Sequence, residues 1–224
     1  NQTIYHSPWG STTLTKDVCA NMDCSSSYYD NACGVCPSKP NKDKVHQAPS
    51  KMGDITNSPY STELNVAYLR AYNFWITTMP TIQQANIEGN LIRSHMAKMM
   101  VEFAALFDRK INTGANCSFT DMKKQSDEMK YYSTLACQLW LMGLDDNGNP
   151  AEKFNPSDTA TRAQFGTALS RLLYGNVNNA QKGTQRYAQH LEALNNAGIM
   201  KKIDDPSMKE LRWYVMLMMM RAGK

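Results

Sequence analysis

From about residue 60 almost to the C-terminus, apolar residues recur at a spacing of three to four positions. This spacing predicts amphipathic helices. Three stretches each place apolar side chains on one helical face: Ile92, Met96, Met99, Phe103 and Leu106; Phe165, Leu169, Leu172 and Leu173; and Leu211, Val215, Met218 and Met219. Each stretch follows another amphipathic segment, beginning near Glu63, Lys130 or Gln185. The pattern therefore predicts a mainly α fold.

Polar residues predict where these helices begin. Residues 81–84 ("TIQQ") and 161–164 ("TRAQ") fit the capping box, in which a Thr and a Gln each satisfy a free backbone N–H. Pro206 followed by residues 207–210 ("SMKE") predicts the third start, and Gly175 ends the second helix. Residues 213–220 ("WYVMLMMM") are apolar nearly all round, so we expect the last helix to be buried or covered by a partner.

Residues 1–58 lack such periodicity, and we expect an irregular N-terminal segment joined near Pro59 to a helical region over 59–224. Four of the six cysteines lie in this segment: Cys19, Cys24, Cys33 and Cys36. Disulfides or a zinc ion can hold such a segment together. We favour disulfides because Cys117 and Cys137 form a further, distant pair, which suggests an oxidising compartment.

The helical region also repeats itself, which is the strongest organisational signal in the chain. Setting Gly143 against Gly198 aligns Tyr132 with Tyr187, and Trp75 takes the place of the glycine in the first copy. The second helix of each copy carries an arginine near its start: Arg93, Arg162 and Arg212.

The second copy begins with "F-x-D" at residues 119–121, continues to a Gly-Leu step, and then has "FNPSD" and "TRAQF". In this order the residues resemble the S-layer homology domains of bacterial surface proteins, with repeats at about 60–108, 117–175 and 185–222. The resemblance implies three helix-loop-helix units in a pseudo-trimer, with the arginine-bearing helices at its centre. It also implies that the arginine of the "TRAE" motif contributes to an acidic, pyruvylated sugar site between repeats, which nominates Arg162, then Arg212 and Arg93. The motif departs to "TRAQ", "NLIR" and "KELR", and a guanidinium serves equally to tie one repeat to the next.

Other chemistry is less well supported by the sequence. The net charge is +4 and no run of five like charges occurs, which argues against nucleic-acid binding. No apolar run approaches the ~18 residues of a membrane span. Asp145, Asn147 and Asn149 have calcium-loop spacing but lack the bidentate glutamate, so we favour a turn and expect no metal. Asn1 and Asn116 begin N-x-[ST] triplets, which leaves their glycosylation open.

The sequence contains no catalytic motif that we recognise, and the four histidines are isolated: His6, His46, His95 and His190. We therefore expect neither an enzyme nor a cofactor. The expected protein is a non-catalytic structural protein of the bacterial cell surface that assembles with copies of itself into an extracellular layer or filament. The residues expected to anchor assembly are Ile4, Tyr5, Trp9 and Trp213.

Three alternatives remain. One is a monomeric S-layer homology module that anchors another activity to cell-wall polysaccharide. A second is a secreted hydrolase, which needs a carboxylate pair or triad that the sequence does not display. The third is a zinc-ribbon protein that binds nucleic acid, which the charge pattern disfavours.

Overall fold

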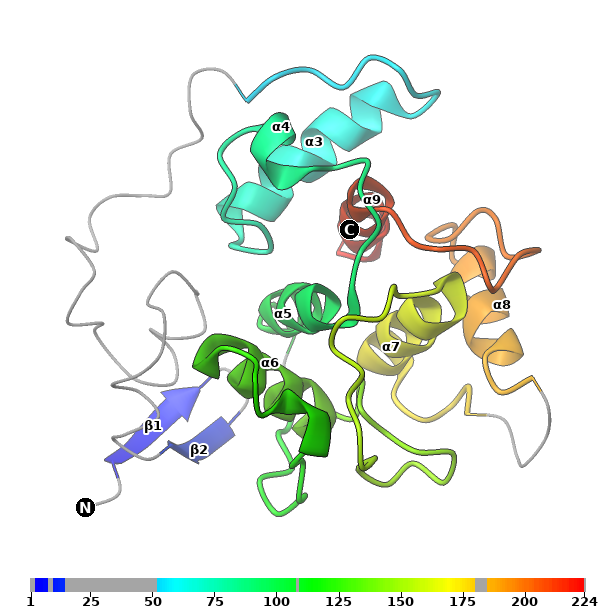
Figure 1. The fold of residues 1–224 in the computed structure, drawn as a ribbon. Helices are drawn as coiled ribbons and strands as arrows, with labels where there is room; N and C mark the ends of the chain where they lie inside the picture. The colour runs from blue at the N-terminus through cyan, green and yellow to red at the C-terminus, as the bar shows by residue number, and fades with distance from the viewer. Residues whose placement is uncertain (1–2, 8–9, 15–51, 108, 180–184, 224) are drawn as a thin grey trace.

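The computed structural model describes residues 3–7, 10–14, 52–107, 109–179 and 185–223, and the fold is mainly helical (Figure 1). Its helices are α3 (Ser61–Asn73), α4 (Ile82–Ala85), α5 (Arg93–Ala104), α6 (Asp127–Gln138), α7 (Arg162–Tyr174), α8 (Ala188–Asn196) and α9 (Arg212–Ala222). A short 3-10 turn covers Thr120–Met122. Strands β1 (Thr3–Ser7) and β2 (Gly10–Leu14) pair as an antiparallel hairpin, so this part of the N-terminal segment is regular where we expected it to be irregular.

The helices pack in pairs, α5 with α6, α7 with α8, and α3 with α9. Figure 1 shows α5, α7 and α9 gathered around the centre, with α6, α8 and α3 outside them. The pairing of α3 with α9 joins the first long helix of the described region to the last. Large apolar side chains fill the space between the pairs, among them Phe154, Phe165, Leu64, Leu91, Met96, Met100, Leu135, Leu169 and Leu172.

Close helix contact needs a glycine at one position. A Cβ atom on Gly166 of α7 would collide with the end of the Leu191 side chain on α8, so the missing side chain at residue 166 lets Leu191 pack directly onto α7.

One of the three predicted helix starts is confirmed. Thr161 accepts a hydrogen bond from the Gln164 N–H while the Gln164 side chain accepts one from the Thr161 N–H, a complete capping box. At Thr81 only half of the predicted box forms: its hydroxyl accepts the Gln84 N–H, while the Gln84 side chain accepts from that hydroxyl instead of the Thr81 backbone. This cap begins the four-residue α4, and α5 starts later, after Ile92. The third start is also wrong, because residues 206–210 bond to other segments and α9 begins after Leu211.

The ends of α3, α6 and α8 correct the alignment of the copies. Two residues beyond each helix the backbone turns left-handed, at Trp75 (φ 62°), Trp140 (φ 60°) and Gly198 (φ 69°). The second amide after each turn then returns to the end of its helix, as from Met142 to the Ala136 carbonyl. Gly198 therefore corresponds to Trp140, three positions before Gly143. The glycine match was misleading because a tryptophan holds a conformation that usually favours glycine.

Backbone hydrogen bonds close a ring at the centre of the molecule. Leu91 donates to the Glu210 carbonyl (2.8 Å), Glu210 donates to Ala160 (2.9 Å), and Ala160 donates back to Leu91 (2.8 Å). The three segments that precede α5, α7 and α9 are thus bonded to one another in a cycle. Each depends on the other two for its backbone partners.

Helix α9 is buried on all sides within this chain. Every residue from Val215 to Met220 is buried, and Trp213 is only 8% exposed. We expected this helix to be buried or covered by a partner, and burial is confirmed, because α3 and its neighbours cover its apolar surface. Trp213 is therefore wrong as an exposed assembly anchor.

The packed unit starts before the predicted boundary at Pro59. Ile55 is 4% exposed, its N–H donates to Asn65 Oδ1 (2.9 Å), and Asn65 Nδ2 donates back to its carbonyl (3.1 Å). Residues just ahead of α3 thus belong to the core.

Candidate functional site

The backbone ring places three arginines at corresponding positions, each as the first residue of its helix. The Arg93 N–H donates to the Asp158 carbonyl (2.9 Å) and the Arg162 N–H to Met208 (2.8 Å). The Arg212 N–H donates to Gly89 (3.2 Å). Each helix that carries an arginine is thus docked onto the loop of another segment.

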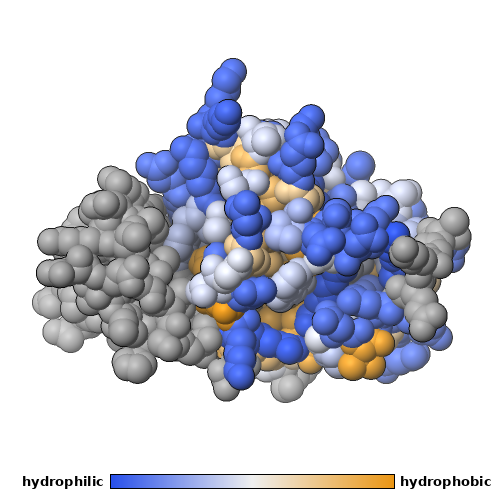
Figure 2. Space-filling model, turned by 90° about the horizontal axis from the view of Figure 1, so that it is seen from below, coloured by the Kyte–Doolittle hydropathy of each residue, from blue (hydrophilic) through white to orange (hydrophobic). Residues whose placement is uncertain are grey.

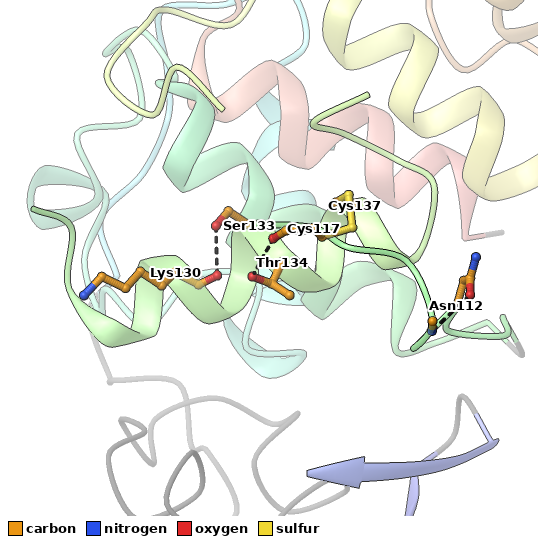
Figure 3. Close-up of a disulfide and its surroundings, with 7 residues drawn as sticks. Asn112, Cys117, Lys130, Ser133, Thr134 and Cys137 are labelled. Atoms are coloured by element: carbon orange, nitrogen blue, oxygen red, sulfur yellow. Dashed lines mark hydrogen bonds between the residues drawn. A yellow bond between two sulfur atoms is a disulfide. The ribbon is translucent and has the colours of Figure 1, made fainter. Parts of the chain in front are cut away.

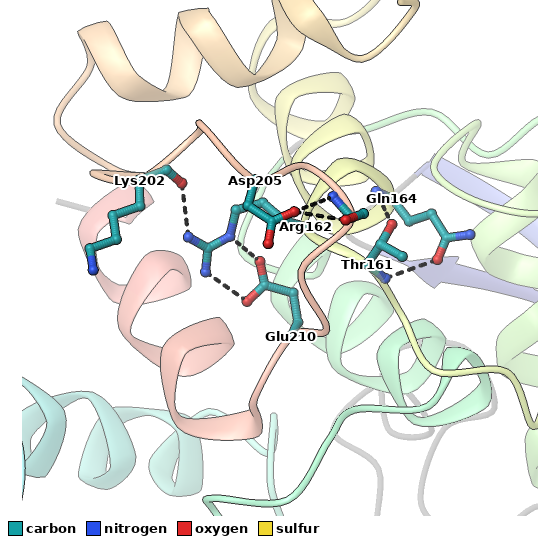
Figure 4. Close-up of polar contacts among 7 residues, drawn as sticks. Thr161, Arg162, Gln164, Lys202, Asp205 and Glu210 are labelled. Carbon is teal, nitrogen blue, oxygen red and sulfur yellow. Dashed lines mark hydrogen bonds and ion pairs between the residues drawn. The ribbon is translucent and has the colours of Figure 1, made fainter.

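The guanidinium of Arg162 is fully engaged inside the molecule (Figure 4). Its Nε donates to Glu210 Oε1 (2.6 Å) and its Nη2 to Oε2 (3.1 Å), while Nη1 donates to the Lys202 carbonyl (2.8 Å). Arg162 is 6% exposed and Glu210 is 0% exposed. Burial raises the pKa of Glu210, and the hydrogen bonds and charge of Arg162 oppose that rise. The pair ties α7 to the segment before α9.

Arg93 and Arg212 are less enclosed, and neither has a bidentate carboxylate partner within the described part of the chain. Arg93 Nε donates to the Phe154 carbonyl (2.8 Å), and the guanidinium lies 5.2 Å from the centre of the Phe154 ring. Arg212 donates to the Asn86 carbonyl (3.4 Å) and lies 3.3 Å from His95 Nδ1. All three arginines therefore contact a carbonyl of another segment.

An open groove of about 280 Å³ lies beside Arg93, between the loop that follows α6 and the outer face of α7. Its polar lining consists of Arg93, Arg171, Arg186, Gln164, Thr167 and Tyr187, and the remaining lining residues are Met96, Leu141, Met142, Gly143, Leu144 and Ala163. Among the described residues, no aspartate or glutamate lines it. Such a surface offers several N–H donors and positive charge to an anion.

Burial lowers the pKa of Arg93 and of Arg171, although Asp158 and Asp121 act in the opposite sense on Arg93. Neither guanidinium has a carboxylate within ion-pair distance in the part of the chain that the structure describes. Arg186 differs, because it pairs with the exposed Asp146 at 3.0 Å.

A buried polar network stands behind Arg171. His190 is 1% exposed; its Nε2 lies 3.0 Å from Asn179 Oδ1 and its Nδ1 lies 2.9 Å from Ser170 Oγ. Because an amide oxygen can only accept, Nε2 carries the hydrogen and Nδ1 accepts from the hydroxyl. Asn179 Oδ1 also accepts a weak bond from Arg171 Nε (3.4 Å). Burial and the charge of Arg171 lower the pKa of His190 to about 4.

The predicted disulfide between Cys117 and Cys137 is confirmed (Figure 3). Its Cα atoms are 5.9 Å apart, and it fixes the segment before the 3-10 turn to α6. Thr134 Oγ1 supports the same contact by donating to the Cys117 carbonyl (3.4 Å). The other cysteines of the prediction lie outside the described residues: Cys19, Cys24, Cys33 and Cys36.

The loop after α6 forms the predicted turn. Asp145 Oδ1 accepts the N–H groups of Asn147 (2.8 Å) and Asn149 (2.9 Å), and these bonds lower the pKa of Asp145. Across the described residues, no group of three or more His, Cys, Asp or Glu side chains gathers in a way that could hold a metal ion. Asn116 is exposed beside the disulfide, and Asn1 lies outside the described residues.

The assembly residues of the N-terminal segment are only partly placed. Ile4 and Tyr5 lie in β1, whereas Trp9 is outside the described residues. Elsewhere, polar side chains dominate the face seen in Figure 2, with apolar patches between them. Seven large apolar residues of the described region are substantially exposed: Val66, Leu69, Phe74, Met79, Leu106, Tyr174 and Val177. In the described ranges, no helix has the length and apolar character needed to cross a bilayer.

Sequence reasoning missed Glu210 and Arg171. Glu210 is the acidic partner that "TRAQ" lacks, but it comes from the next copy. The sequence does hold a clue to Glu210: its carboxylate stands at a position of the ring where the other two residues, Leu91 and Ala160, are apolar. Arg171 lies on the outer face of α7, where a charged residue is ordinary, so only the groove distinguishes it.

Comparison with known proteins adds no family assignment. A scan against protein-family models finds no match, and a search of curated proteins finds no similar sequence.

Proposed function

We propose that residues 59–224 form three S-layer homology repeats in a pseudo-trimer, and that they anchor a non-catalytic surface protein to acidic cell-wall polysaccharide. The repeat arrangement is supported by the backbone ring and by the matching dockings of Arg93, Arg162 and Arg212. An exported, surface location is in keeping with the Cys117–Cys137 disulfide, since such bonds persist in oxidising compartments.

One observation carries the binding proposal, namely the carboxylate-free groove beside Arg93. Its volume is close to the lower end of the range of small-ligand sites, about 300 Å³, so it suits one small group such as a single sugar unit. The arginines supply planar forks for a carboxylate. The apolar wall from Leu141 to Leu144 offers a surface for the face of a sugar ring.

Sedimentation with bacterial cell walls tests this proposal. We expect the full chain to sediment with walls that carry their anionic polysaccharide, and not with walls from which acid has stripped it. Replacing Arg93 with Gln should weaken binding about tenfold or more, because a charge-assisted hydrogen bond contributes roughly 1.5–3 kcal/mol. Arg70→Gln is the matched control, since Arg70 is an exposed arginine of α3 outside the groove.

Two results would contradict the proposal. One is equal sedimentation with intact and stripped walls, which means that the polysaccharide is not the ligand. The other is an equal loss of binding in the Arg93→Gln and Arg70→Gln variants, which indicates general charge attraction instead of a site.

Self-assembly into a layer or filament is the second candidate. It is favoured by a small apolar hollow of about 90 Å³ between α3, α5 and α9, bordered by the exposed Phe74 (45%) and Leu106 (47%). Deleting residues 1–15 tests whether the N-terminal segment mediates assembly, and Leu106→Lys tests the hollow. Electron microscopy and sedimentation velocity of each variant should show loss of high-mass species in the one whose contact was removed. If both variants assemble like the intact chain, neither contact is used.

A further inference from the structure

The groove beside Arg93 has a counterpart beside Arg162. Helix α5 docks onto residues 156–158 through the N–H groups of Arg93 and Ser94, and α7 docks onto residues 206–208 through those of Arg162 and Ala163. One wall of the first groove is α7, where Arg171 lies. We call the position beside Arg162 the second place. Its matching wall is α9, where Arg221 follows Arg212 by the same number of residues as Arg171 follows Arg162.

Side chains of this chain close the second place. Arg162 is held by both oxygens of Glu210 (Figure 4). Arg221 is held by both oxygens of Glu63, at 2.9 Å and 3.0 Å. The Tyr60 ring then lies 5.4 Å from the Arg221 guanidinium, with Lys201 5.0 Å from the same ring. Both guanidinium groups therefore already have an internal carboxylate.

The third corresponding position, beside Arg212, carries negative charge. Glu102 of α5 takes the position that Arg171 has on α7, and it accepts a hydrogen bond from the Tyr132 hydroxyl. Nearby, Lys98 pairs with Glu128 at 2.5 Å. An incoming anion would meet carboxylates there that are already paired.

Only the first place combines two partly buried arginines with no carboxylate at ion-pair distance among the described residues. Arg93 and Arg171 have lost part of their hydration, and neither has a carboxylate within ion-pair distance among the described residues, although Asp158 and Asp121 act on Arg93 from farther away. A cation in this state gains more from an external anion than one that is already paired.

We propose that each chain holds a single acidic ligand group, bound between Arg93 and Arg171, and that Glu210 and Glu63 act as internal carboxylates that keep the corresponding site closed. This inference rests on the proposed polysaccharide-binding function. It adds the stoichiometry of that function and identifies Arg171 as a ligand-contacting residue.

Titration calorimetry with trigalacturonate, a short sugar chain with a carboxylate on every unit, tests the inference on the full chain. Its methyl ester is the neutral control. We expect about one binding site per chain for the acid and no heat for the ester. Arg171→Gln should weaken binding about tenfold or more, because it removes a charge-assisted contact. Arg221→Gln, at the corresponding position of α9, should leave the affinity within about twofold and lower the Tm instead, because it breaks an internal ion pair.

The outcomes separate the two proposals. A wild-type chain that binds neither this acid nor cell walls overturns the proposed function and with it the inference. A wild-type chain that binds two or more acids overturns the inference alone. So does an Arg221→Gln variant whose affinity falls as far as that of Arg171→Gln while circular dichroism shows both variants folded.

Discussion

Replacing Arg162 with Gln should cost this protein a large part of its stability. The substitution leaves the carboxylate of Glu210, which is 0% exposed, without its two hydrogen bonds and its counter-charge. It also frees the Lys202 carbonyl. Breaking a buried ion pair from one side typically costs 3–5 kcal/mol, whereas whole domains are stable by only about 5–15 kcal/mol. We therefore expect the free energy of unfolding to fall by about 3 kcal/mol or more.

Urea denaturation followed by circular dichroism measures this loss. Arg93→Gln is a matched control at the corresponding position, and we expect it to cost less, about 1.5 kcal/mol, because it removes one charge-assisted bond to a carbonyl and leaves no buried carboxylate unpaired. The double variant Arg162→Met with Glu210→Leu should recover at least half of the loss, since it removes both buried charges together.

A loss below about 1 kcal/mol in Arg162→Gln, combined with loss of cell-wall binding, would refute this reasoning. Arg162 would then be a ligand residue and its contact with Glu210 incidental. A double variant no more stable than the single one would refute the explanation by unpaired charge.

Other predictions concern single features of the fold. The pKa of His190 is lowered from 6.5 to about 4, so as the pH falls the imidazole of the unfolded chain is protonated before that of the folded chain. The contribution of His190 to stability is therefore full above about pH 6.5 and falls by about 3 kcal/mol towards pH 4. Urea titrations across this range should show that His190→Leu flattens the slope. Replacing Cys117 and Cys137 together with Ser should lower the free energy of unfolding by about 3 kcal/mol, the chain-entropy value for a loop of this size, and an unchanged urea midpoint would contradict it. Gly166→Ala should lower it by about 1–3 kcal/mol through the collision with α8, whereas Gly114→Ala, in an open loop, should leave the melting temperature nearly unchanged.

The sequence was most informative where one local rule acts alone. The start of α7 was predictable because Thr161 and Gln164 satisfy each other's backbone within a few residues. The disulfide was predictable because Cys117 and Cys137 are only 20 positions apart, so their closure is local. The helical class followed in the same way from apolar spacing within each helix.

Predictions failed where a distant segment decides the structure. Helix α9 starts after Leu211 instead of at Ser207, because the backbone before it bonds to the segments that precede α5 and α7. Trp140 adopts a left-handed turn that its residue type does not suggest, and this shifted the alignment by three positions.

The candidate site was the least predictable part. Arg93 was nominated because of its place in the copy, but whether a carboxylate lies within ion-pair distance of it depends on which charges the other segments bring; none does among the described residues. Glu210 illustrates the difficulty, since its partner Arg162 is 48 residues away in the chain. The same residue type at corresponding positions thus has different surroundings.

The pairing of α3 with α9 has a consequence for how the protein comes to be folded in its cell. Arg221 and Glu63 are 158 residues apart, and the central ring also lacks one of its three members until Glu210 has been made. Contacts this distant form late, since the intervening chain must first be brought together. A nascent chain in which α9 has not yet been synthesised therefore keeps the apolar face of α3 uncovered. It reaches its final form only when the last of its three central helices has been made.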